Sequence, residues 1–175
     1  MHLHPGPVVS LLLALTWADL SAQQACTLLS SAEIEAITGS KAREPQPTNM
    51  KIPSGTQAGQ TVNGCMWGTA DKGMVSISVM PMPTDPATRK AGMEKLDEVY
   101  AKLRARKWTQ EEQKYPHGRC TTMTPPATEK SAPILSGCIA DVHGMLVSSS
   151  YMSPTKKLPM DKSKALVDKI ASHMH

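Results

Sequence analysis

The chain has 175 residues, which is room for one domain, and carries 19 basic and 15 acidic residues for a net charge of +4. It has no Phe, and twelve Met stand where a core normally holds Phe and Leu; Met packs flexibly and specifies a core shape less sharply. The basic residues are spread along the chain, whereas nucleic-acid binding normally needs a concentrated basic face with interleaved aromatics, which argues against this function.

The amino terminus predicts export. Val8–Ala18 is a continuous apolar run of eleven residues. A membrane-spanning helix needs about 20 such residues, whereas the core of a signal peptide needs about 7–15. Leu20–Ala22 supplies a cleavage site, although no Lys or Arg precedes the run, which leaves a misassigned start open. We expect residues 1–22 to be a signal peptide, residues 23–175 to form a single domain, and the mature protein to be periplasmic or secreted.

The four cysteines predict disulfides. An even number in an exported chain indicates a disulfide framework, and four cysteines allow three connectivities. None lies at the C-x-x-C spacing typical of zinc and thioredoxin-like sites. Pairing by neighbourhood gives Cys26–Cys65 and Cys120–Cys138, and a Cys26–Cys120 link is the alternative.

Cys26 has a second alternative, because it follows the apolar run as a lipidated cysteine would. Lipid attachment needs a Leu-like residue three positions earlier and small residues between. Gln23 and Gln24 occupy that stretch, which favours the disulfide.

The first predicted elements are a short helix, a loop and a strand pair. Ser30 and Glu33 form a capping box that opens a helix over 31–38, and Gly39 ends it. Residues 40–61 are polar and rich in Pro, Gly, Gln and Thr, which predicts a long loop. Strands follow at 62–68 and 75–79, joined by a turn at 71–73 in which Gly73 takes a positive φ.

The second half is predicted to hold a helix, a second group of strands and a last helix. Asp85-Pro86 opens a helix whose apolar stripe (Met93, Leu96, Tyr100, Leu103) predicts packing against a sheet. Strands are expected at 110–115, 118–124, 134–142 and 145–152, with a tight turn at His143-Gly144, and a last helix at 161–174. The order predicts an α+β fold in which helices flank a mainly antiparallel sheet.

Three segments resemble a broad class of uncharacterised exported bacterial proteins and lipoproteins. They are the helix start at 26–34, the Gly64–Trp67 strand segment and the helix segment at 165–171. The resemblance implies a PsbP-like α-β-α sandwich and supports the Cys26–Cys65 pairing, but implies no activity. The chain departs from the class over 114–120, and the second cysteine pair is not carried over.

Two enzyme hypotheses can be set against the sequence. Cys120 with His117 or His143 would form a nucleophile only as a free thiolate, whereas an exported chain normally oxidises such a cysteine. Ser153–Lys156 matches an S-x-x-K pattern, but its partner motifs are missing and the stretch is a polar connector. We therefore expect no enzyme activity and no catalytic residue.

The favoured function is an exported, non-enzymatic binding module. It would engage a protein or an envelope component through its sheet face or the 40–61 loop, and one specific form is an immunity or inhibitor protein. The alternative is a periplasmic copper-binding protein, because thioethers are soft ligands for Cu(I). Met80-Pro81-Met82 and His173-Met174-His175 would supply the ligands, although Met also fills cores and the terminal pair ends a helix. No metal residue or cofactor is assigned.

Overall fold

The computed structural model describes residues 22–52 and 58–174, so the predicted signal peptide lies outside the described residues except for Ala22. Four helices and seven strands make up the described part of the chain. In order they are α1 (Ala22–Ala25), α2 (Ser31–Thr38), β1 (Gln46–Lys51), β2 (Thr61–Gly68), β3 (Met74–Pro81), α3 (Pro86–Ala105), β4 (Thr109–Tyr115), β5 (Gly118–Thr124), β6 (Ile134–Val142), β7 (Met145–Ser153) and α4 (Met160–His173).

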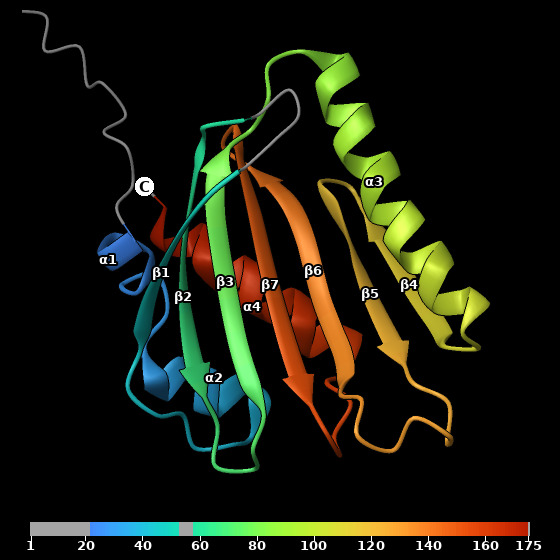
Figure 1. The fold of residues 1–175 in the computed structure, drawn as a ribbon. Coiled ribbons are helices and arrows are strands. Elements are labelled where there is room, and N and C mark those ends of the chain that lie inside the picture. Colours follow the sequence, from blue (N-terminus) through green and yellow to red (C-terminus); the bar gives the residue numbers. More distant parts are fainter. Residues whose placement is uncertain (1–21, 53–57, 175) are drawn as a thin grey trace, which may run out of the picture.

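The strands form one seven-stranded sheet in the order β1-β2-β3-β7-β6-β5-β4, and every neighbouring pair is antiparallel (Figure 1). A two-residue turn joins β6 to β7 through His143 and Gly144, which have φ values of 51° and 77°. Two positive φ values are what a type I′ hairpin turn requires. The sheet and its flanking helices confirm the predicted α+β class.

Helices α1, α2 and α4 pack on one face of the sheet, which we call the helical face. Leu166 and Ile170 of α4 are buried there together with Trp67 and Tyr151 from the strands. Leu29, just before α2, adds the amino-terminal segment to the same core. Figure 1 shows α4 crossing behind the strands, whereas α3 lies on the opposite side. We call that opposite side the open face.

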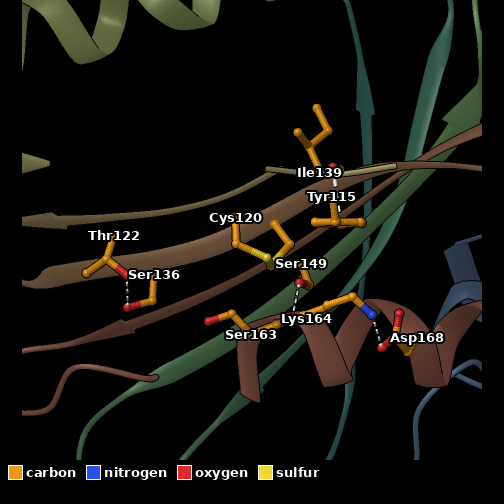
Figure 2. The surroundings of a disulfide bond; sticks show 10 residues. Tyr115, Cys120, Thr122, Ser136, Ile139, Ser149, Ser163, Lys164 and Asp168 are labelled. Carbon is orange, nitrogen blue, oxygen red and sulfur yellow. Dashed lines mark hydrogen bonds and ion pairs between the residues drawn. A yellow bond between two sulfur atoms is a disulfide. The ribbon is translucent and has the colours of Figure 1, made fainter. Parts of the chain in front are cut away.

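Both predicted disulfides are present. Cys26–Cys65 ties the segment between α1 and α2 to the second strand, so Cys26 is a disulfide partner and the lipidated alternative is wrong for this structure. Cys120–Cys138 joins residues directly opposite each other on β5 and β6, above α4 (Figure 2). Disulfides persist in oxidising compartments, so the two bonds favour a location outside the cytoplasm.

The capping prediction for α2 is confirmed atom by atom. The Glu33 backbone N–H donates to Ser30 Oγ at 3.2 Å, and the Ser30 N–H donates to the Glu33 carboxylate at 2.8 Å. Gly39 ends the helix with a φ of 69°, in the left-handed region where a glycine costs least.

The loop predicted over 40–61 is wrong in part, because β1 lies within it. This strand sits at the sheet edge and exposes both faces, with Met50 63% exposed. A strand that buries neither face has no need of alternating apolar residues, and Pro47 is tolerated at an edge. The sequence pattern therefore had no signal for it.

The turn between β2 and β3 also differs from the prediction. Lys72, not Gly73, has the positive φ, at 63°. Gly73 is needed for space, because a Cβ at that position would lie 2.7 Å from Thr69 Oγ1 and 3.1 Å from Tyr151 Oη.

Candidate functional site

The register of the strands brings small polar side chains to the centre of the open face. Ser76 lies opposite Ser150, and Ser78 opposite Ser148, with the hydroxyl oxygens of each pair 2.7 Å apart. Their alternation with buried residues of β3 and β7 is that of a sheet whose second face meets solvent. The centre of this face therefore carries short side chains and is lined with hydroxyl groups.

A row of larger apolar side chains borders the serines. The register places four of them side by side across β3, β7, β6 and β5, namely Met74, Met152, Leu135 and Met123. Met123 is buried and the others are half-buried. Because Met is flexible and polarisable, such a row can adapt to ligands of different shape.

Helix α3 covers part of the open face without packing tightly on it. All twenty of its residues are described and none is buried, in contrast to the packing that its apolar stripe predicts. Leu96 and Tyr100 instead line a cavity of about 400 Å³ between the helix and strands β5–β7. Gly137 and Thr121 contribute to its floor. We call this cavity the α3 groove.

Arg119 on β5 stands at the end of the α3 groove away from the methionine row. Its side chain is 12% exposed and its Nη2 lies 2.7 Å from an Asp97 carboxylate oxygen of α3, with Glu112 Oε2 3.6 Å from Nη1. The guanidinium lies 5.7 Å from the centre of the Tyr100 ring. Among the described residues that line the groove, Arg119 is the one with a charged side chain.

The carboxyl end of α3 is attached through Glu129. Trp108, which is 7% exposed, donates from Nε1 to a Glu129 carboxylate oxygen at 3.1 Å, and Arg106 pairs with the same oxygen at 2.7 Å. At the other end, the Asp85 carboxylate accepts from the Ala87 and Thr88 backbone N–H groups. The contacts with Glu129 thus attach the carboxyl end of the helix, whereas those of Asp85 cap its first turn.

A second hollow, of about 590 Å³, lies between two hairpin turns and α4. His117 and His143 line it, which places both histidines of the Cys–His hypothesis at the surface. Lys164 lies 5.4 Å from the centre of the Tyr115 ring and donates to Asp168. Burial raises the pKa of Tyr115 above its usual range, and the Asp168 charge adds to the shift. The apolar lining and single cation of the α3 groove are more typical of a ligand site.

Cys120, Ser153 and Lys156 of the two enzyme hypotheses have structural roles. Cys120 is oxidised in a disulfide and offers no thiolate to either histidine. Ser153 ends β7, and its hydroxyl accepts from the backbone N–H groups of Thr155 and Lys156. Lys156 donates to the Thr38 carbonyl at 2.7 Å and so caps the end of α2. Both members of the S-x-x-K pattern thus have structural partners.

His175 of the copper alternative lies outside the described residues, and Met80 and His173 have structural roles. Met80 is only 9% exposed. His173 Nδ1 lies 3.0 Å from the Leu28 carbonyl, and its Nε2 is 3.6 Å from Glu33. Within residues 22–52 and 58–174, no group of three or more His, Cys, Asp or Glu could hold a metal ion. Across the same ranges, no helix is long and apolar enough to span a membrane.

Sequence reasoning missed Arg119, and it interpreted the stripe of α3 as ordinary packing. A signal was present in the two serine-alternating strands, since Ser76, Ser78, Ser148 and Ser150 would leave little apolar surface for a helix to cover. The position of Arg119 under α3 depends on strand register and could not be read from spacing.

Comparison with known proteins supports the fold alone. No protein-family model matches the chain, and a search of curated proteins found no significant match. Among solved structures, the extracellular domain of PknH from Mycobacterium tuberculosis is similar, with a TM-score of 0.61 and 14% sequence identity. The similarity covers 87% of this chain and 95% of that domain.

Proposed function

We propose that the protein is a periplasmic or secreted binding module, without catalytic activity, that takes an envelope component into the α3 groove. One observation carries the proposal: a twenty-residue helix with no buried side chain stands over half-buried apolar residues on the open face. A helix in a globular protein normally gains its stability by burying an apolar stripe. Leu96 and Tyr100 face a cavity instead, whose volume is within the 300–1,000 Å³ usual for ligand pockets.

Titration of the mature protein with the neutral apolar fluorophore N-phenyl-1-naphthylamine tests the proposal. Leu96→Gln removes an apolar wall of the groove and should weaken binding about tenfold, as expected for losing roughly 1–2 kcal/mol of apolar contact.

Val99→Gln is the matched control, because Val99 is on the same helix and is 51% exposed. It should bind the fluorophore as the wild type does. Equal losses in both variants, or no uptake by the wild type, would refute the proposal.

A protein partner remains the other form of binding module, including the toxin or hydrolase that an immunity protein would inhibit. Such a partner would lie across the same open face. If the Leu96→Gln variant captured the partner as well as the wild type does, the partner's interface would lie outside the open face.

Copper binding is a second candidate, and one observation favours it. Met74 and Met152 are cross-strand neighbours on the open face, and Met66 is diagonal to Met74. Thioethers so placed are soft ligands suited to Cu(I). Titration with Cu(I) against a competing chelator tests it; uptake weaker than about micromolar, or unchanged in Met74→Leu/Met152→Leu, would end this candidate.

A further inference from the structure

The α3 groove has a polarity gradient along its length. Leu135 and Met123 lie at one end, in the methionine row, and Arg119 lies four residues from Met123 on the same strand. Four residues of strand span about 13 Å. Between the two ends the floor is made of small and hydroxyl-bearing residues, including Gly137, Thr121 and Ser150.

Arg119 is incompletely hydrogen-bonded in its enclosed position. Its Nε and Nη2 are buried and have no hydrogen-bond partner among the described residues. The Nη2 does lie 2.7 Å from Asp97, but as an ion pair without hydrogen-bond alignment. A planar guanidinium binds a carboxylate best through two parallel hydrogen bonds, and this geometry is not used here.

We infer that the α3 groove binds a single-chain amphiphile with an anionic head, whose carboxylate replaces Asp97 at Arg119 while its chain lies toward the methionine row. This inference rests on the proposed function and specifies its ligand. An extended chain advances about 1.2 Å per bond, so about eleven bonds span the 13 Å from Arg119 to the row. A chain of about twelve carbons therefore fits.

The exchange of carboxylates costs little. Asp97 is 55% exposed and can turn to water, and an ion pair with so exposed a partner contributes about 0–1 kcal/mol. A buried guanidinium needs a counterion, and the incoming carboxylate supplies one. Glu112 stays 3.6 Å away on the neighbouring strand, so the site keeps the charge balance it has now.

The same exchange removes one contact between helix α3 and the sheet. Asp97 and Tyr100 both contact Arg119 from α3, so they cover the guanidinium and hold the middle of the helix to the sheet. A ligand that takes Asp97's place leaves the Tyr100 contact with Arg119, while the Glu129 contacts hold the carboxyl end of the helix. Binding of the head group therefore weakens the attachment of the middle of α3 to the sheet.

Calorimetric titration with dodecanoate and with dodecanol, below their aggregation limits and at pH 8, tests the inference. These probes share a chain length and differ in charge. The wild type should bind dodecanoate about tenfold more tightly than dodecanol, the preference that a charge-assisted hydrogen-bond pair gives. Arg119→Gln should abolish the preference, and Lys114→Gln, an exposed cation on β4, should keep it.

Asp97→Asn gives an independent test that leaves the buried arginine in place. Removing the competing carboxylate should tighten dodecanoate binding several-fold and leave dodecanol unchanged. Weaker or unchanged dodecanoate binding in Asp97→Asn would overturn the inference, as would equal affinity of the wild type for both probes. In the latter case the groove still binds apolar chains and the proposed function stands. Failure of both probes, with no uptake of the naphthylamine, would remove both.

Discussion

Asp71 accepts hydrogen bonds from three hydroxyl groups on three segments of the chain. Ser40 Oγ donates at 2.6 Å, Thr69 Oγ1 at 2.5 Å and Tyr151 Oη at 3.1 Å. These bonds hold the pKa of the Asp71 carboxyl well below its usual range, and the bond from Ser40 has the largest effect. Burial opposes the shift. The three donors are buried, so the carboxylate joins the end of α2 to the sheet.

We predict that Asp71→Asn lowers the free energy of unfolding by about 1–3 kcal/mol at pH 7, because buried hydroxyls lose a charged acceptor. Because the pKa of Asp71 is lower in the folded than in the unfolded state, where it is about 3.9, the ionised carboxylate stabilises the fold fully above about pH 3.9. Below that pH the stabilisation becomes progressively smaller. The difference in the free energy of unfolding between wild type and variant should therefore be smaller at pH 3 than at pH 7, by about 1 kcal/mol. Urea denaturation at both pH values measures it.

Asp168→Asn is the control for this prediction, since its pair with Lys164 is exposed and should contribute less than about 1 kcal/mol. A control loss as large as that of Asp71→Asn would show that the hydroxyl network is not the cause. A gap that stays constant down to pH 3 would contradict the pKa argument.

At the scale of elements, α3 and α4 are helices of opposite kinds. Helix α4 buries Leu166, Val167 and Ile170 in the core, whereas α3 buries none of its twenty residues. Local opening costs least where few apolar contacts are lost. We predict that amide hydrogens of α3 exchange with solvent at least tenfold faster than those of α4, as measured by hydrogen-exchange mass spectrometry. Equal protection of the two helices would show that α3 is packed more firmly than its exposure indicates.

At the scale of the whole molecule, the two disulfides constrain different lengths of chain. Cys26–Cys65 closes 39 residues and Cys120–Cys138 closes 18, so loop entropy assigns them about 4 and 3 kcal/mol of stabilisation. The first also links the segment of α1 and α2 to strand β2 of the sheet. The second joins strands that are already hydrogen-bonded neighbours. We predict that the double variant Cys26→Ser/Cys65→Ser loses more stability than Cys120→Ser/Cys138→Ser in urea denaturation. The reverse order would contradict the prediction.

Most elements of this fold could be predicted because their signals are local. The Ser30–Glu33 capping box, the Asp85-Pro86 start of α3 and the His143-Gly144 turn each act within a few residues, and all three are present. Strand β1 could not be predicted, because it buries neither face and is defined only by its pairing with β2. The role of Gly73 could not be predicted for a similar reason, since its close neighbours include Tyr151 of β7, which is distant in the sequence.

The sequence alone determined the order of most elements and the α+β class, and it favoured the two cysteine pairings that the structure has, because periodicity, capping and chain proximity act over short distances. The tertiary structure decided which face of the sheet stays open and what gathers on it. Arg119, Ser150 and Leu96 come from three separate elements, and they meet only through strand register and the placement of α3. The stripe on α3 indicated a helix but not its partner, because an amphipathic pattern specifies that a face is apolar and not what will cover it.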